Sequence, residues 1–436
     1  MEPITIGYLS LVAIGLTIYS GIHVAIALSV VSLIGVWAIT GKLNLALNFV
    51  TLAATDSIAD YTFGVVPLFV LMGLAVSESG LGRDTFAVVS RMTRGVRGGL
   101  GMATVISNAI FAAITGISIA SAAVFAKVAV PEMVRAGYAR SVAVGVVAGS
   151  SVLGMLIPPS LLLILFAVLT DSSIGELFLG GVGPGLLLTA AYCLYLLVLG
   201  RLRPHLFERA DGGDAGASRE RAPLRQLIPV VLLAGSVLGG IYTGFFTPTE
   251  AGAVGAGLAL LLAAVMRRLD MGASWRIAVQ TGHITAAVCF LIIGASIYGR
   301  MLSFSGVPAS LTEWAIGSGI GHFGFLVLFS LILIALGTIL DSASIMLVTV
   351  PLAFPIAQQL GTDPVHFGLI TVLAVEIGLL TPPLGLSVFV VQSTLKDMGV
   401  TLGEVFRGAA PFAAIMATVL LLVILFPEIV MVAVGR

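Results

Sequence analysis

Two proline pairs interrupt long apolar segments at equivalent places in the two halves of the sequence. Pro158-Pro159 lies within residues 151–161, and Pro382-Pro383 lies within residues 376–386. Proline donates no backbone N–H and its ring clashes with the carbonyl one turn earlier, so a helix cannot continue unbroken through such a pair. In a lipid bilayer a broken helix is tolerated where it is buried in protein or lines a cavity. The two breaks therefore indicate a binding site within the membrane.

Small and hydroxyl-bearing residues cluster beside these breaks and in two further segments. Carbonyls freed by a broken helix and side-chain hydroxyls are neutral oxygen ligands, which suit a monovalent cation such as Na⁺. Half-helix N-termini offer N–H groups to an anionic substrate. Close helix packing is the alternative reason for small residues. The predicted sodium-binding residues are Gly116, Ser118, Ser121, Gly154, Pro158, Ser342, Ser344, Gly378 and Thr381, and the predicted substrate-binding residues at the breaks are Ser160 and Pro383.

Three charged residues in the apolar segments need a reason, because a charge inside a membrane is costly. Asp341 adjoins the hydroxyl cluster at 342–344 and Glu376 precedes the second proline pair, so both are candidates for an ion path. A structural ion pair is the alternative for Glu376. Arg300 could hold a substrate carboxylate through two parallel hydrogen bonds. The alternative for Arg300 is a side chain that extends to the lipid headgroups.

Composition places the chain in a lipid bilayer and excludes several classes of function. The 436 residues are 58% hydrophobic and 10% charged, against about 25% charged in soluble domains. The formal net charge is zero, which indicates no nucleic-acid partner. Cys193 and Cys289 lie in apolar segments, and the five histidines have no metal-ligand spacing. Without a Walker loop or a nucleophile motif, the sequence predicts no enzyme, no cofactor and no metal other than Na⁺.

Basic residues predict the orientation of the apolar segments, because they favour the cytoplasmic side. Arginines flank both ends of residues 98–133, which predicts a re-entrant hairpin that enters from the cytoplasm and turns near Gly116. The corresponding second-half loops, 308–323 and 359–364, contain no Lys or Arg and are predicted to be periplasmic. The second hairpin, 324–361, is therefore predicted to enter from the opposite side, and both termini are predicted to be periplasmic.

Matching motifs recur in the same order in the two halves, as an internal repeat requires. The sequence predicts an all-α polytopic membrane protein, with an inverted-topology repeat of about ten transmembrane helices and two opposed re-entrant hairpins, which is an architecture of secondary transporters. The predicted first repeat is 1–205, the cytoplasmic linker is 206–226 and the second repeat is 227–436. Within the repeats, the predicted scaffold spans are 4–40 and 227–266, and the predicted transport parts are 61–199 and 277–433.

Six segments in order carry a family resemblance. They are PLFVLMG at 67–73, FAAITGISIASAA at 111–123, PEMVRAGY at 131–138, GMLIPPS at 154–160, PTEAGAVG at 248–255 and GLLTPPLGL at 378–386. With them the chain resembles, over nearly its whole length, the large membrane subunit of tripartite ATP-independent periplasmic (TRAP) transporters, the DctM-like family. In that family the first hairpin usually turns at Gly-Ser-Ser-x-Ala-Thr. Here Ile117 replaces the first of those serines and removes one hydroxyl.

The resemblance implies a function, a location and partners. Members are similar to elevator-type Na⁺ symporters of the bacterial inner membrane that import a small carboxylate, such as a C4-dicarboxylate or sialic acid. A soluble periplasmic substrate-binding protein delivers the substrate. A small four-helix membrane subunit completes the complex, and it is expected to be a separate polypeptide because this chain has no extra four-helix region. A stand-alone ion-coupled carboxylate transporter or antiporter is the alternative within transport. A channel and a membrane-embedded enzyme are the alternatives from other classes.

Overall fold

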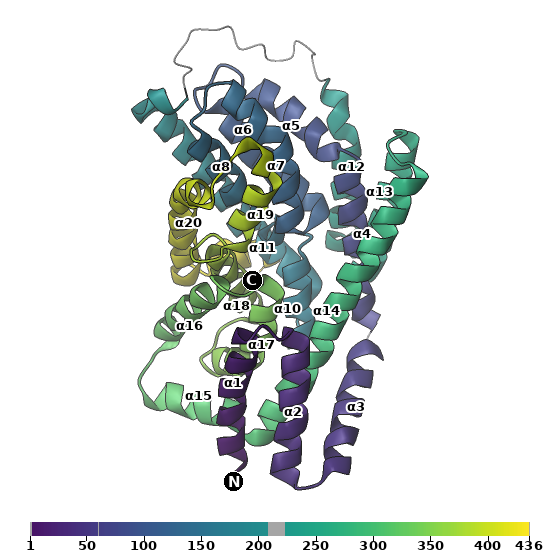
Figure 1. The fold of residues 1–436 in the computed structure, drawn as a ribbon, viewed down its shortest axis with the longest axis vertical. Helices are drawn as coiled ribbons and strands as arrows, with labels where there is room; N and C mark the ends of the chain where they lie inside the picture. Colours follow the sequence, from purple (N-terminus) through teal and green to yellow (C-terminus); the bar gives the residue numbers. More distant parts are fainter. Residues whose placement is uncertain (1, 60, 208–222, 436) are drawn as a thin grey trace.

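The computed structural model describes residues 2–59, 61–207 and 223–435, and these residues form helices and no strand (Figure 1). This confirms the prediction of an all-α polytopic membrane protein. Short 3-10 turns, η1 to η4, occupy Tyr61–Gly64, Pro204–Leu206, Leu224–Leu227 and Lys396–Met398. Most of the predicted linker, 206–226, lies outside the described residues.

The first half of the chain begins with two helices joined by a tight turn and ends with a long helix that follows the first proline pair. Its helices are α1 (Pro3–Tyr19), α2 (Val24–Thr40), α3 (Leu43–Ala59), α4 (Val65–Glu78), α5 (Leu81–Met92), α6 (Gly99–Thr115), α7 (Ser118–Arg135), α8 (Arg140–Ser151), α9 (Leu153–Leu156), α10 (Leu161–Thr170) and α11 (Ile174–Leu202).

The second half repeats this order, with one long helix, α14, in place of α3 and α4. Its helices are α12 (Ile228–Tyr242), α13 (Pro248–Val265), α14 (Met271–Ser305), α15 (Val307–Gly317), α16 (His322–Gly337), α17 (Ser342–Gln359), α18 (Pro364–Gly378), α19 (Leu386–Thr394), α20 (Leu402–Leu425) and the short α21 (Glu428–Val434). Equivalent helices begin in the same way: the Ser173 hydroxyl caps α11 and the Thr401 hydroxyl caps α20, each by accepting the N–H of a glutamate three residues on.

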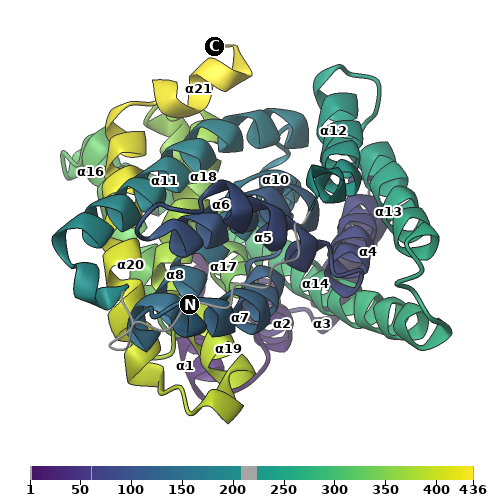
Figure 2. The ribbon, with the colours of Figure 1, turned by 90° about the horizontal axis from the view of Figure 1, so that it is seen from above.

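The two halves pack on each other reciprocally. α2 lies against α14, and α13 lies against α4. α10 lies against α17 and α19 lies against α7, so the helix after each proline pair packs on the other half's hairpin. Figure 1 places α6 and α7 toward one end of the molecule and α16 and α17 toward the other. Figure 2 shows α12, α13 and α4 grouped on one side, away from α16 and α20.

The number of helices long enough to span a membrane is lower than the ten predicted spans. Among the described residues, seven helices pass a test of length and composition, or eight if α4 and α5 form one bent span. The difference has a physical cause: α1 and α2 have only 17 residues each, and α18 ends at Gly378, just before the second proline pair. The seven include α17, which the sequence assigned to a hairpin.

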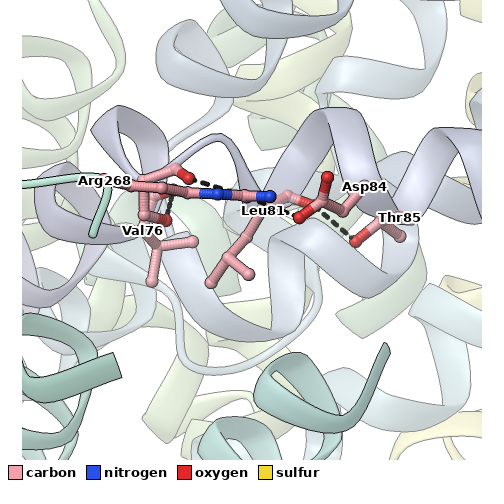
Figure 3. A network of polar contacts seen from close by, with 6 residues as sticks. Val76, Leu81, Asp84, Thr85 and Arg268 are labelled. Carbon is pink, nitrogen blue, oxygen red and sulfur yellow. Dashed lines mark hydrogen bonds and ion pairs between the residues drawn. The ribbon is translucent and has the colours of Figure 1, made fainter. Parts of the chain in front are cut away.

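An ion pair fastens the turn between α13 and α14 to the junction of α4 and α5 (Figure 3). At this junction, α4 and α5 meet with a bend of 62°. Nη1 of Arg268 donates to the carbonyl of Ser79 at 3.0 Å and to Oδ2 of Asp84 at 2.5 Å. The Asp84 side chain is only 11% exposed. Arg268 thus satisfies a carbonyl at the C-terminal end of α4 and a carboxylate in the first turn of α5.

Replacing Arg268 by methionine is expected to lower the free energy of unfolding by about 1–2 kcal/mol, because a largely buried carboxylate and a carbonyl lose their donor. Arg276→Met is the matched control. Arg276 lies 3.6 Å from Glu78 and is 57% exposed, so its loss is expected to change stability by less than about 0.5 kcal/mol. Thermal unfolding of the purified variants in detergent compares them. Equal losses from the two substitutions would contradict this role for Arg268.

Candidate functional site

The turn between α6 and α7, here called the first tip (residues 115–118), lies against the first break (residues 157–160), which separates α9 from α10. α6 ends at Thr115 and Gly116 has a φ of +65°. The N–H of Leu161 donates to the carbonyl of Gly116 at 3.1 Å. A Cβ at Gly116 would come within 2.5 Å of the carbonyl oxygen of Pro159. Both the backbone conformation and the close approach therefore require glycine.

The first tip and first break bring together most of the first predicted sodium-binding set. A Cβ at Gly154 would lie 3.0 Å from Cα of Ser118, so α9 touches the start of α7. Pro158 is buried beside them. The hydroxyls of Ser118 and Ser121 are fully buried and have no hydrogen-bond partner among the described residues. Buried hydroxyls are normally partnered, so these two oxygens are available to a ligand.

Ser160 has a different role from its neighbours. Its hydroxyl donates to the carbonyl of Met155 and accepts the N–H of Leu163 at 3.3 Å. The side chain therefore caps α10 and is fully buried. The hydroxyl could donate to a substrate carboxylate only if its bond to the Met155 carbonyl broke, because it has a single proton. At this break, the N-terminal end of α10 can therefore offer a substrate only its backbone N–H groups.

The second tip (residues 338–341, between α16 and α17) meets the second break (residues 379–385, between α18 and α19) in an equivalent way. The N–H of Leu384 donates to the carbonyl of Thr338 at 3.1 Å. A Cβ at Gly378 would lie 2.6 Å from Cα of Gly337, so the two helices touch backbone to backbone. Sequence reasoning named Gly378 but missed Gly337 and Thr338. The offset that relates the two proline pairs, applied to Gly116, would have placed the tip near residue 340.

The second predicted sodium-binding set lies around this tip. Asp341 caps α17, with Oδ2 accepting the N–H of Ser344 at 3.1 Å and Oδ1 accepting its hydroxyl. Ser342 and Ser344 are 6% and 2% exposed. The Thr381 hydroxyl donates to the carbonyl of Ile377 at 2.8 Å and keeps its lone pairs free for a cation. Neutral oxygens thus surround one carboxylate at this tip.

The two breaks differ in exposure. Pro158 and Pro159 are buried, whereas Pro382 and Pro383 are exposed. The first tip is covered by α4, where a Cβ at Gly73 would come within 2.6 Å of the carbonyl oxygen of Thr115. The second tip has no such cover: Asp341 is exposed and Ile339 is 56% exposed. The open side of the site is therefore the second tip and the second break.

Glu376 is fully buried on α18, two residues before Gly378. Neither carboxylate oxygen meets hydrogen-bonding geometry with another described residue, and the Ser342 hydroxyl lies beside the side chain. No described Lys or Arg forms an ion pair with it. The structural ion pair considered from the sequence is therefore absent from the described residues. A buried carboxylate without a partner is costly, and a cation bound there would offset that cost.

The structure does not bring Arg300 to the tips. Its Nη1 lies 2.9 Å from Oδ2 of Asp56, so the guanidinium joins α14 to α3. The preceding residue, Gly299, packs on Pro351, where a Cβ would lie 3.5 Å from the proline Cβ. Pro351 is nine residues along α17 from Ser342, which is about 13 Å at 1.5 Å per residue. The sequence could not reveal this pairing, because Asp56 lies in α3, 244 residues earlier in the chain.

The arrangement as a whole presents oxygen ligands of the kind that suit a small ion. Among the described residues, no group of three or more His, Cys, Asp or Glu side chains could hold a metal ion. The two tip–break pairs present backbone carbonyls and hydroxyls, which are ligands for a monovalent cation. The N-terminal ends of α7 and α19 have no side-chain cap, so their N–H groups remain available to an anion.

Comparison with known proteins agrees with this geometry. Residues 11–429 match the family model described as "Tripartite ATP-independent periplasmic transporter, DctM component". The chain is 33% identical to the C4-dicarboxylate TRAP transporter large permease protein DctM of Pseudomonas aeruginosa, over 85% of each chain. It is 30% identical to the isethionate TRAP transporter permease protein DctMQ of Oleidesulfovibrio alaskensis, over 98% of this chain and 66% of that protein.

A solved structure shares the fold at low sequence identity. The Alcanivorax borkumensis YdaH transporter, described as having an unusual topology, superimposes with a TM-score of 0.61 and 15% identity. The match covers 88% of this chain and 89% of that one. At this identity the likeness concerns the fold alone.

Gly116→Ala tests the contact between the first tip and the first break. Alanine at a positive φ costs about 1 kcal/mol anywhere, and here its Cβ would also collide with the Pro159 carbonyl. Gly95→Ala is the matched control, because Gly95 has a φ of +89° and open space around it. The expected result in thermal unfolding is a loss at least about 1 kcal/mol larger for Gly116→Ala, since overpacking adds to the backbone strain. Indistinguishable melting temperatures would show that the tip does not press on the break.

Proposed function

This chain belongs to the DctM component of the tripartite ATP-independent periplasmic transporters, and from that membership we propose that it is the large permease subunit of a Na⁺-coupled importer of small organic acids. The observation that carries the proposal is the pair of buried, unpartnered hydroxyls of Ser118 and Ser121 where the first tip meets the first break. Oxygens kept out of the protein's own hydrogen bonds are what a coupling cation needs.

We assign two sodium sites, one to each tip–break pair. The first consists of Gly116, Ser118, Ser121, Gly154 and Pro158, and the second of Ser342, Ser344, Gly378 and Thr381. Glu376 and Asp341 border the second site. The substrate anion lies between the two sites, against the exposed Pro383 and the uncapped helix N-termini, while Ser160 fixes the start of α10. Arg300 links α14 to α3 through its ion pair with Asp56, so we do not assign it to the substrate.

Two partners complete the proposed importer in the bacterial inner membrane. A soluble periplasmic binding protein delivers the substrate, and a small four-helix subunit stands beside this chain as a separate polypeptide. The length of the relative named DctMQ supports the second partner, because this chain covers 66% of it and a fused small subunit would account for the remainder. The hairpins and broken helices form the moving part of an elevator, and α1, α2, α12 and α13 belong to its scaffold.

The alternative is a stand-alone ion-coupled carboxylate transporter or antiporter of the same plan. Proteoliposomes that contain this chain and its small subunit separate the two. An importer of the proposed kind takes up a labelled acid only when an inward Na⁺ gradient and the binding protein are both present. Uptake that needs no binding protein would favour the stand-alone transporter. Uptake that does not saturate would favour a channel.

Ser118→Ala is expected to raise the Na⁺ concentration for half-maximal uptake about fivefold to tenfold, because one ligand worth roughly 1 kcal/mol is lost. Ser393→Ala, on the exposed face of α19, is the matched control and is expected to leave the Na⁺ dependence unchanged. The measurement is initial uptake against external Na⁺ in proteoliposomes. If Ser118→Ala changed only the maximal rate and not the Na⁺ dependence, the first sodium site would be misplaced.

The proposed inverted orientation predicts opposite sides for two loops. Single cysteines are introduced at Arg94 and at Ser318 in a variant that lacks Cys193 and Cys289. A membrane-impermeant thiol reagent applied to intact cells is expected to label position 318 and to leave position 94 unlabelled until the inner membrane is opened. Labelling of both positions from the same side would contradict the inverted repeat.

A further inference from the structure

We propose that an anionic phospholipid binds with its phosphate against one arginine-rich surface of this chain. This site is separate from the tips and breaks and does not depend on the transport function proposed above. The surface, here called the basic surface, consists of Arg94, Arg97, Arg201, Arg203 and Arg225, all of which are exposed. Three features point to the lipid: the packing of three segments together, their shortage of carboxylates, and exposed apolar side chains beside the arginines.

Packing brings three separate segments of the chain to the basic surface. The loop between α5 and α6 touches the end of α11, where a Cβ at Gly200 would lie 2.9 Å from the carbonyl oxygen of Arg97. Arg201 and Arg203 follow Gly200 directly. The turn η3, which contains Arg225, packs against α5. α5, α6 and α12, the helix after η3, lie toward one end of the molecule (Figure 1). The basic surface therefore spans the entry to the first hairpin and the start of α12.

The segments that supply these arginines are long stretches without a carboxylate. Asp and Glu are absent from three ranges, 85–131, 177–207 and 223–249. Among the described residues, Arg94, Arg201 and Arg203 form no ion pair with an acidic side chain. A surface with charge of one sign attracts the opposite charge. Guanidinium groups bind phosphate through two parallel hydrogen bonds, so a phosphate is the anion that this surface fits.

The linker at 208–222, which lies outside the described residues, has too little net charge to neutralise the basic surface. Its charged residues are Glu208, Asp211, Asp214, Glu220, Arg209, Arg219 and Arg221. Four negative charges less three positive charges leave one net negative charge, against five arginines on the basic surface. The basic surface therefore keeps a net positive charge that attracts a further anion.

Large apolar side chains lie exposed beside these arginines. Met92, two residues before Arg94, is 70% exposed, and Leu202, between two arginines, is 76% exposed. Leu224 immediately precedes Arg225 and is 63% exposed. Arginine interleaved with exposed apolar side chains is typical of a surface at the membrane interface, where the apolar groups meet acyl chains and the arginines reach anionic headgroups. This pattern favours a phospholipid over a soluble phosphate, which would leave the apolar side chains in water.

Two phospholipids with the same acyl chains test the headgroup. Dioleoyl phosphatidylglycerol and dioleoyl phosphatidylcholine are titrated into the full-length chain purified in detergent, and inorganic phosphate is the third ligand. Binding is read as a rise in melting temperature. Phosphatidylglycerol is expected to reach its half-maximal effect at a concentration at least tenfold lower than phosphatidylcholine, because choline neutralises the phosphate. Equal effects of the two lipids would overturn the proposal. Stabilisation by inorganic phosphate as large as that by phosphatidylglycerol would overturn it too, by assigning the surface to a soluble anion.

Arginine variants locate the effect at the basic surface. Arg94→Gln and Arg203→Gln are each expected to raise the concentration of phosphatidylglycerol for the half-maximal effect about fivefold, since each arginine near a lipid surface contributes separately to binding. Phosphatidylcholine is expected to respond much less. Arg135→Gln is the matched control, because Arg135 is 70% exposed but is paired with Glu132 at 2.6 Å. An unchanged lipid preference in both Arg94→Gln and Arg203→Gln would overturn the proposal, and so would an equal loss in Arg135→Gln.

Discussion

The structure depends on one constraint: the backbone groups freed by a broken helix in a bilayer must be buried in protein or line a cavity. Shortly after the two proline pairs, the N–H groups of Leu161 and Leu384 donate to carbonyls at a hairpin tip. Each hairpin tip therefore supplies a carbonyl acceptor to a backbone N–H beside a break. The close contacts at Gly116 and between Gly337 and Gly378 follow, because a tip must approach its break at backbone distance.

The repeat that builds the two tip–break pairs does not make them equivalent. α4 presses on the first tip, with Gly73 against the Thr115 carbonyl. Its counterpart α14 meets the second hairpin at Pro351, well along α17, and leaves the second tip open. A transporter must close one side of its site whenever the other is open, since simultaneous access would dissipate the ion gradient. In this structure the site is therefore covered at the first tip and open at the second.

The sequence predicted what local chemistry determines and missed what long-range packing determines. The proline pairs located both breaks, and Gly116 located the first tip, because proline and glycine impose backbone geometry wherever they occur. The all-helical fold followed from composition. By contrast, the ion pairs of Arg300 with Asp56 and of Arg268 with Asp84 depend on how distant helices pack, and no local pattern records that. For the same reason Arg300 was assigned to the substrate: its charge is visible in the sequence, whereas its partner is not.

The placement of charge explains how such a site would couple its ligands. Arg268 and Arg300, which are paired with carboxylates, lie at helix junctions and crossings, and the tips and breaks contain no cation of their own. An anion that enters a low-dielectric site without a protein cation is unstable there. On the function proposed here, sodium bound at the neutral oxygens would supply the missing charge, and each ligand would then raise the affinity for the other by the same factor. On the function proposed here, the coupling of sodium to the organic acid follows from the absence of a basic residue and needs no separate device.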